Sequence, residues 1–492
     1  MDHSVDLAML AGCALLLVAV LAVRLSSRAG VPALLVYLGI GLVIGQVVDT
    51  SVATYDVTSQ LGLVALAVIL AEGGLTTGWS KVRPVLPMAG VLSTVGVLIS
   101  VAAVGGASML LLGTSFRTAL LLGAAVASTD AAAVFSVLRR LPVTSRLRSL
   151  LEAESGLNDA PTVVLVTLAS SDSWASTGAW EVAGLIGYEL VVGLLVGAAV
   201  GLGGRYALAR LALPSAGLYP IATVATVLLA FGAGGSLHAS GFLAVYVAGL
   251  LVGSARLPHR RAVIGFTTSL SLLAELALFV LLGLLATPSR LVDALPAALV
   301  VGSTAIVLAR PLAVLVSTTP FGLPWRQQVF LSWAGLRGAV PIVLAIVPVT
   351  AGVPGATDVL DVVFVLVVVF TALQAPTLPY VGRRLGVVED LEARDLEVEA
   401  APLESARADL LQVVVRPGSQ LHGVYVDELR LPRGAVLSLV VRGGEGMVPS
   451  AETQLLRGDQ LLVVATSDSR SAAEERLRAV SRDGKLARWY KT

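Results

Sequence analysis

The chain has 492 residues, of which 56% are hydrophobic and only 14% charged, and its formal net charge is +1. Soluble domains carry nearer to a quarter of charged residues. The composition therefore excludes an ordinary soluble protein, and the mean hydropathy of +0.87 predicts a polytopic membrane protein. The near-neutral charge gives no sign of a nucleic-acid partner, and none is expected. The single cysteine, Cys13, excludes an intrachain disulfide and a metal site built from several thiolates.

Apolar runs long enough to cross a bilayer recur from the N-terminus to about residue 384. They predict an all-α membrane domain over residues 1–384 with about thirteen transmembrane helices. The predicted spans centre on residues 7–23, 31–48, 58–77, 85–113, 116–138, 149–170, 180–203, 217–236, 239–254, 262–287, 292–317, 327–350 and 357–381.

Basic residues gather in alternate connections between these spans. Because Lys and Arg are retained on the cytoplasmic side of a membrane, this asymmetry predicts the orientation of the chain. It places the N-terminus outside and, with an odd number of spans, everything after residue 384 in the cytoplasm. The basic residues are Arg24, Arg28, Lys81, Arg83, Arg139, Arg140, Arg146, Arg148, Arg205, Arg210, Arg256, Arg260, Arg261, Arg326, Arg383 and Arg384.

The composition changes after Arg384. Residues 385–408 form an acidic segment that predicts a solvated linker. Alternating apolar runs separated by Gly and Pro turns then predict short strands in a small cytosolic α+β domain at 409–472. Residues 473–492 are predicted as a helical tail, with the helix ending at Gly484.

Five places interrupt the apolar spans with polar residues. An ionisable side chain at bilayer depth is costly, so each is a candidate functional position. Glu154 to Asp159 lie in one such place, and on a helix Ser155, Asn158 and Asp159 share one face that could hold a cation or a proton. The other places contain Glu72, Thr129 with Asp130, Glu275, and Arg337.

Arg337 lies among Gly335, Gly338 and Pro341, and such a cluster predicts an interrupted helix. Interrupted helices at membrane depth are tolerated where they line an enclosed cavity, and their ends can hold ions. If spans one to six repeat as spans eight to thirteen, the Thr129–Asp130 span matches the Arg337 span. The pattern indicates an inverted-repeat transporter.

Other interpretations remain open at several positions. Glu72 either contacts the ion or pairs with an arginine, and Glu275 is expected to be structural or to face a vestibule. Arg310 either pairs with an acid or extends to the membrane interface. His259 is expected to be an ordinary surface residue, with tuning of a pH response as the alternative. A cation channel with a cytosolic gating domain is a remote alternative, but no selectivity filter is evident. An enzyme is not expected, because the four histidines are scattered and no nucleophile motif occurs.

Several of these segments carry a family resemblance. The strings ASTDAAAVFS, EAESGLNDAP, GLRGAVPIVLA and SGFLAVYVAGLLVG closely resemble the monovalent cation/proton antiporters of the NhaP branch. The segments VRPGSQLHGVYVDEL, LPRGAVLSLVVR and LLRGDQLLVV resemble the C-terminal TrkA-type (RCK-C) domain of potassium transport regulators. Together they resemble the potassium/proton antiporter subgroup linked to cell volume regulation and pH homeostasis.

The resemblance implies roles for individual residues. Asp159 is expected to bind either the cation or the proton, with Asp130, Ser155 and Thr129 supplying further oxygens. The resemblance also implies residues that organise the site. Asn158 is expected to be held by Arg337, Glu154 to pair with Arg310, and Glu72 to match the acidic position of span three.

Competition between proton and cation at Asp159 predicts antiport in the cell membrane, and because Asn158 cannot titrate, one proton is expected to exchange for one cation. The resemblance favours K⁺, with Na⁺/H⁺ exchange as the alternative. It also implies a homodimer and a regulatory nucleotide, such as cyclic di-AMP, at the C-terminal domain. No cofactor is expected. NAD binding is not expected either, since the segment before that domain is too short for a dinucleotide-binding fold.

Overall fold

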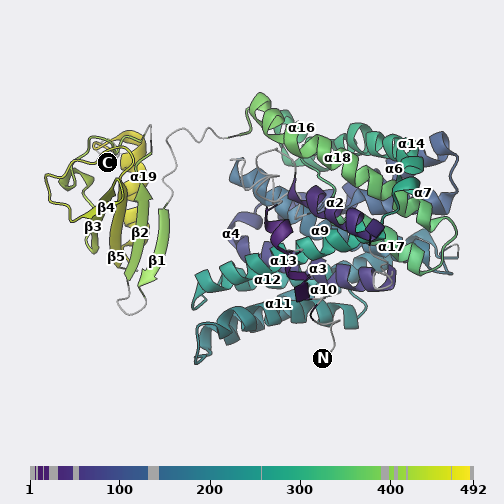
Figure 1. Ribbon diagram of the computed structural model, residues 1–492, viewed down its shortest axis with the longest axis horizontal. Helices are drawn as coiled ribbons and strands as arrows, with labels where there is room; N and C mark the ends of the chain where they lie inside the picture. The colour runs from purple at the N-terminus through teal and green to yellow at the C-terminus, as the bar shows by residue number, and fades with distance from the viewer. Residues whose placement is uncertain are drawn as a thin grey trace. The chain divides into compact units, whose positions relative to one another are not determined.

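The computed structural model describes residues 6–487 with the exception of 7–8, 11, 15, 22–31, 48–54, 131–142, 175, 256, 389–397, 404–407, 417–418 and 467. It divides into two compact units, Met1–Val388 and Glu389–Thr492. The first is helical and the second contains the sheet (Figure 1). The predicted fold class, an α-helical membrane domain followed by a small α+β domain, is confirmed.

The helical unit contains α-helices interrupted by short 3₁₀ and π segments. Its elements are α2 (Ala33–Val47), α3 (Tyr55–Thr76), α4 (Trp79–Val82), α5 (Leu86–Val91), η1 (Leu92–Gly96), α6 (Val97–Leu112), α7 (Phe116–Ala127), α9 (Ser145–Ser170), α10 (Ala179–Arg210), α11 (Leu218–Ser236), α12 (Gly241–Gly253), α13 (Arg260–Leu285), α14 (Pro288–Thr304), η2 (Ala305–Ala309), α15 (Arg310–Thr318), η3 (Thr319–Phe321), α16 (Trp325–Trp333), α17 (Ala339–Thr350) and α18 (Ala356–Leu385). The first predicted span, 7–23, lies partly outside the described residues. The loop residues Arg24, Arg28, Arg139, Arg140 and Arg256 lie wholly outside them.

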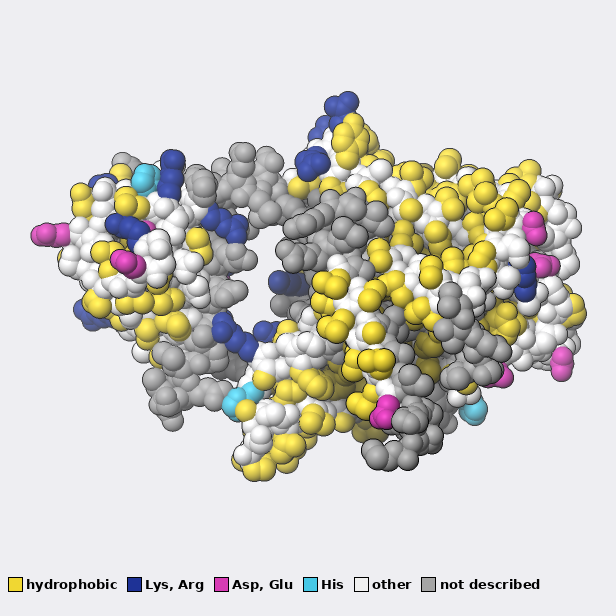
Figure 2. Space-filling model, in the orientation of Figure 1, with side chains coloured by type: hydrophobic (Ala, Val, Ile, Leu, Met, Phe, Trp, Pro, Cys, Tyr) yellow, Lys and Arg dark blue, Asp and Glu magenta, His cyan; other side chains and the backbone are white. Residues whose placement is uncertain are grey.

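Among the described residues, seven helical segments are long and apolar enough to cross a membrane. Shorter apolar helices, including α7, α12 and α17, accompany them. Helix α17 is short because the predicted span 327–350 is divided into α16 and α17. Apolar side chains cover much of the visible face of this unit (Figure 2). Within α10 only 17% of the most apolar window is buried, which is the exposure expected of a helix that faces lipid or a partner chain. The predicted number of thirteen spans stays a prediction.

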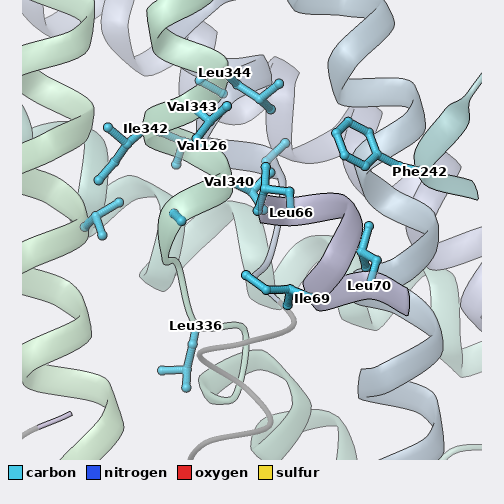
Figure 3. Packing of buried hydrophobic residues seen from close by; sticks show 14 of the residues in the cluster. Leu66, Ile69, Leu70, Val126, Phe242, Leu336, Val340, Ile342, Val343 and Leu344 are labelled. Atoms are coloured by element: carbon cyan, nitrogen blue, oxygen red, sulfur yellow. The ribbon is translucent and has the colours of Figure 1, made fainter. Parts of the chain in front are cut away.

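A buried apolar core surrounds the centre of the unit. Helix α3 packs against α12, α13 and α17, and α17 also contacts α7 and α9. Figure 3 shows side chains of these helices together, among them Leu70, Val126, Phe242 and Val343. Leu336 of the same core lies on the non-helical segment between α16 and α17. The polar centre described below is therefore enclosed by apolar packing.

Two spans that correspond to one another in the predicted repeat each contain one turn of π-helix. The η1 turn separates α5 from α6, and η2 separates α14 from α15. These correspond to spans four and eleven of the predicted repeat. The sequence did not indicate either turn, although such turns are frequent at functional sites.

The second unit is a five-stranded antiparallel sheet with the order β1-β2-β5-β3-β4. Its strands are β1 (Val398–Leu403), β2 (Ala408–Val414), β3 (Ala435–Arg442), β4 (Glu445–Met447) and β5 (Gln460–Thr466). The turn η5 (Asp427–Leu429) and the helix α19 (Arg470–Asp483) complete it, and α19 ends before Gly484 as predicted. Strand β1 lies inside the segment predicted as a linker at 385–408, of which residues 389–397 and 404–407 are outside the described residues. Residues 488–492 of the predicted tail are outside them as well.

Candidate ion-binding site

The end of one helix and the break between two others meet at the centre of the helical unit. Helix α7 ends at Ala127 and is followed by an extended segment from Ser128 to Asp130, while residues 334–338 separate α16 from α17. The two segments are joined by the main chain, because the N–H of Asp130 donates to the carbonyl of Leu336 at 3.1 Å. Unwound backbone of this kind requires hydrogen-bond partners within the protein. The predicted interruption at Arg337 is confirmed, and it lies beside the non-helical segment Ser128–Asp130.

The carboxylate of Asp130 lies at the start of α17. It accepts a hydrogen bond from the N–H of Ala339, the first residue of that helix. A helix N-terminus carries partial positive charge and unpaired N–H groups, so an acidic side chain is stabilised there. Gly338 is required by this approach, since a Cβ at this position would overlap Asp130. Asp130, which follows the end of α7, therefore fixes the start of α17.

Arg337 contacts the C-terminal end of α7. Its guanidinium donates to the carbonyl of Ala127 at 2.9 Å and to that of Ser128 at 2.5 Å. These carbonyls lie at the C-terminal end of α7, where a helix carries partial negative charge. The prediction that Arg337 holds Asn158 is wrong, because Asn158 Oδ1 has no hydrogen-bond partner among the described residues. Arg337 neutralises a helix end instead of holding an amide side chain.

The predicted polar face of α9 points at the non-helical segment after α7. Asp159 Oδ1 accepts a hydrogen bond from Ser128 Oγ at 2.6 Å. Ser155 Oγ donates to the carbonyl of Thr129 at 2.8 Å, and Asn158 Nδ2 donates to Thr129 Oγ1 at 2.6 Å. All of these side chains are buried, Asp159 being only 3% exposed. Candidate oxygens from both elements thus converge in an enclosed place.

Glu154 and Arg310 form the ion pair that the family resemblance implied. The guanidinium donates to both carboxylate oxygens, at 2.8 Å between Nη2 and Oε2. Each residue is joined to a π-turn, because Ser93 of η1 donates to the Glu154 carbonyl at 3.1 Å and Arg310 directly follows η2. The interpretation of Arg310 as a residue that extends to the membrane interface is wrong, since it is 5% exposed.

The remaining acidic and histidine candidates lie further out. Glu72 is buried on α3, where its Oε1 accepts from Thr268 of α13 at 3.2 Å. Glu275 of α13 is half-buried and lies within electrostatic range of Tyr37 on α2. His259 lies against Tyr219, with 5.1 Å between the ring centres. The described contacts of Glu72 thus join α3 to α13.

The donor set at the α9 face consists of carboxylate, hydroxyl, amide and carbonyl oxygens. Such hard ligands suit monovalent cations of the alkali group and protons better than soft metals. In the part of the chain that is described, no three His, Cys, Asp or Glu side chains gather as a multidentate metal site requires. Two buried carboxylates, Asp130 and Asp159, belong to this donor set.

Comparison with known families decides the class of protein. Residues 14–383 match the sodium/hydrogen exchanger transmembrane family, and residues 410–478 match the TrkA-C domain. The chain belongs to the sodium/hydrogen exchanger family. This exchanger is therefore a multi-pass secondary transporter that couples a monovalent cation to protons, and not an enzyme.

Named relatives extend over nearly the whole exchanger. It is 34% identical to the K(+)/H(+) antiporter NhaP of Alkalimonas amylolytica, over 94% of this chain and 82% of the relative. It is 33% identical to the K(+)/H(+) antiporter NhaP2 of Shewanella oneidensis, over 99% of this chain and 86% of the relative. The Na(+)/H(+) antiporter ApNhaP of Aphanothece halophytica is 27% identical over 86% of this chain and 81% of the relative.

The fold also has a counterpart among solved structures. The sodium proton antiporter MjNhaP1 from Methanocaldococcus jannaschii superposes with a TM-score of 0.65 at 22% identity. The match covers 78% of this exchanger and 99% of that chain. At this identity the likeness establishes the fold of the exchanger and not its substrate.

Some residues of the centre were not found from the sequence. Ser128 contacts Asp159, and its position directly before Thr129 and Asp130 was the available signal. Thr371 of α18 donates to the Arg337 carbonyl at 2.5 Å, but a threonine in an apolar span carries no distinguishing pattern. Ser93 was missed for the same reason. Carbonyl acceptors have no sequence signature at all, so the partners of Arg337 could not be read from side-chain types.

Proposed function

We propose that the exchanger trades K⁺ for H⁺, one for one, by competition at Asp159. The observation that carries this proposal is the buried Asp159 carboxylate, which accepts from Ser128 at the end of one helix. A carboxylate in an enclosed site holds either a proton or a cation, because occupation by one removes the charge that attracts the other. If the site changes sides only when occupied, this competition produces exchange.

Further oxygens for the cation come from neighbours of Asp159. Ser155 and Thr129 already contact one another through the Thr129 carbonyl, and their hydroxyl oxygens retain acceptor capacity. Asp130 is the fourth proposed ligand, although one of its oxygens accepts from Ala339. Asn158, Arg337, Glu154, Arg310 and Glu72 are assigned to organising the site. Asn158 cannot titrate, which supports electroneutral exchange.

The preference for K⁺ rests on the relatives named as K(+)/H(+) antiporters. The alternative is Na⁺/H⁺ exchange, which the names of ApNhaP and MjNhaP1 favour. The donor set does not separate these cations, because selectivity between them depends on the number of ligands and the size of the cavity.

The alternation of basic loops supports an orientation with the N-terminus outside the cell membrane and the TrkA-C domain in the cytoplasm. We assign that domain a regulatory role, with a nucleotide such as cyclic di-AMP as its ligand and with a homodimer as the functional assembly. A change in transport rate on adding cyclic di-AMP to the purified exchanger would support its assignment as the regulatory ligand. An unchanged rate would overturn that assignment.

The exchange itself is tested in proteoliposomes that hold a pH gradient. Addition of K⁺ or Na⁺ to wild type should dissipate the gradient without dependence on the membrane potential, and Asp159→Asn should abolish the response. A larger response to Na⁺ would replace the K⁺ assignment. Flux that needs no counter-proton, or that survives in Asp159→Asn, would overturn antiport and favour a channel.

A further inference from the structure

A second polar group lies on the same face of α9, nearer to the start of that helix. Glu152, Gly156 and Asp159 are four and three residues apart, and this spacing places them in one stripe. Glu152 Oε2 accepts from Thr77 Oγ1 at 3.2 Å, and Thr77 directly follows the end of α3. Glu152 is half-buried, so it lies between the surface at this end of the bundle and the buried Asp159.

Charged groups surround this carboxylate. Lys81 of α4, Arg148 of α9 and Glu72 of α3 all lie within electrostatic range of Glu152. In the proposed orientation this end of the bundle faces the cytoplasm. A cation or proton that approaches Asp159 along the α9 stripe from that side meets Glu152 first.

The ring of Tyr246 on α12 packs against α9 at Gly156, which lies between Glu152 and Asp159 in this stripe. A Cβ on Gly156 would lie only 2.9 Å from ring atoms of Tyr246, so the ring lies directly against the backbone of α9. Tyr246 is 1% exposed, and its hydroxyl has no hydrogen-bond partner among the described residues. That hydroxyl lies within electrostatic range of Glu152. A buried hydroxyl without a partner is costly, and it marks a place where another polar group is expected during function.

We propose that Glu152 is an additional cation- and proton-binding residue on the route to Asp159, and that the Tyr246 ring closes this route between the two carboxylates. The inference rests on the proposed exchange at Asp159. Seven residues of helix separate Glu152 from Asp159, which is roughly 10 Å along the axis. An ion cannot contact both carboxylates at once, so a closed barrier between them is compatible with alternating access. When the ring moves, its hydroxyl becomes a partner for the passing ion or its water.

Glu152→Gln tests the first part, with exchange measured separately from each face of vesicles of known orientation. The half-saturating cation concentration at the face where α9 begins should rise several-fold, with maximal rate preserved, because a local negative charge concentrates cations. The proton concentration for half-maximal exchange should shift at the same face in the same direction, since both ions use one route. The opposite face should remain unchanged, and Glu152→Asp should restore most of the affinity.

Glu181→Gln is the matched control, because Glu181 is an exposed acid that caps the N-terminus of α10. It should leave the half-saturating concentrations unchanged at both faces. Equal half-saturating concentrations for Glu152→Gln and wild type at both faces would overturn the role of Glu152. A loss of maximal rate at both faces that Glu152→Asp does not restore would also overturn it, because that is the result of a structural role.

Tyr246→Ala tests the barrier, and Tyr246→Phe separates the ring from the hydroxyl. Tyr246→Ala should let protons or cations leak without exchange, while Tyr246→Phe should keep the coupling tight. A fully coupled Tyr246→Ala would overturn the barrier. If wild type exchanges cations for protons and Asp159→Asn does not, the proposed function stands whatever the outcome at Glu152 and Tyr246. If the wild-type protein does not exchange cations for protons, the proposed function itself is overturned.

Discussion

The carboxylate of Glu154 accepts two hydrogen bonds from the guanidinium of Arg310, and this ion pair joins α9 to α15 deep in the helical unit. Arg310 also donates to the carbonyl of Leu331 on α16 at 3.3 Å. The pair therefore connects the helix that carries Asp159 with the helix that leads into the break at Arg337. Its function is to fix the relative positions of these elements.

Removal of one partner of this pair should destabilise the exchanger strongly. Arg310→Met leaves the Glu154 charge buried without compensation, which costs about 3–5 kcal/mol of unfolding free energy. The double variant Glu154→Gln with Arg310→Met should recover most of that loss, because no buried charge is left. Chemical unfolding of the detergent-solubilised protein measures both.

The control is Arg290→Met. Arg290 pairs with Asp361 at 2.6 Å, but its side chain is 39% exposed. Because Arg290 keeps contact with solvent, breaking this pair should destabilise the protein clearly less than Arg310→Met does. A double variant no more stable than Arg310→Met would show that the ion pair itself is not the cause.

Gly338→Ala should impair transport with little effect on expression. The new Cβ would overlap Asp130 and displace it from the N–H of Ala339. Overpacking of this kind costs about 1–3 kcal/mol, so we expect the exchange rate to decrease by about fivefold or more. Gly232→Ala on α11 has no atom within 4 Å of its new Cβ and should retain wild-type exchange. Equal rates for both variants would contradict the close approach of Asp130 to α17.

The sequence predicted the central carboxylates because a charge in an apolar span is costly and therefore conspicuous. It also predicted the break at Arg337 from glycine and proline. The family resemblance supplied the pairing of Glu154 with Arg310, which spacing alone could not. Arg337 was misassigned, because its partners are backbone carbonyls at the end of α7 and any residue type can supply those. Tyr246 lay in an ordinary apolar run, and only the packing against Gly156 distinguishes it.

Strand β1 shows a similar limit in the second unit. Its sequence, VEAAPL, lies in an acidic segment with weak alternation, so composition favoured a linker. The strand forms because β2 offers an edge, and Val398 to Leu403 pair with it in antiparallel register. Edge pairing of this kind depends on the partner strand and not on local propensity.

Ser128→Ala should weaken cation binding at Asp159. The Ser128 hydroxyl donates to the Asp159 carboxylate at 2.6 Å, and a hydrogen bond to a charged group contributes about 1.5–3 kcal/mol. We expect the half-saturating cation concentration to rise by about tenfold or more. Isotope-uptake assays at fixed pH measure it.

Ser108→Ala is the matched control for that experiment. Ser108 is also fully buried, but its hydroxyl donates to the carbonyl of Val104 within its own helix. Its loss should leave cation affinity unchanged. If Ser108→Ala and Ser128→Ala raised the half-saturating concentration equally, the contact between Ser128 and Asp159 would have no specific role.

Asp459 controls the acid stability of the C-terminal unit. It is fully buried directly before β5, where Arg442 donates to both carboxylate oxygens at 2.8 Å and the N–H of Leu456 donates at 2.8 Å. Burial by itself would raise the pKa of Asp459, but the hydrogen bonds from Arg442 and Leu456 outweigh it, and the pKa lies below its ordinary value of 3.8. The ionised form is therefore the one that stabilises the fold.

This lowered pKa fixes the direction of the pH dependence. A depressed carboxyl pKa contributes stability that is present above the unfolded value and disappears as pH falls through the folded value. Asp459→Asn should thus lower the free energy of unfolding by about 1.5–3 kcal/mol at neutral pH. The difference in this free energy between variant and wild type should decrease only when the pH falls below the ordinary pKa of 3.8. Urea unfolding of the compact unit Glu389–Thr492, from neutral pH to below that value, measures the difference. The exposed Glu452→Gln serves as control and should follow wild type throughout. A difference that stayed constant down to the lowest pH would mean that Asp459 stabilises the unit by packing and not by its charge.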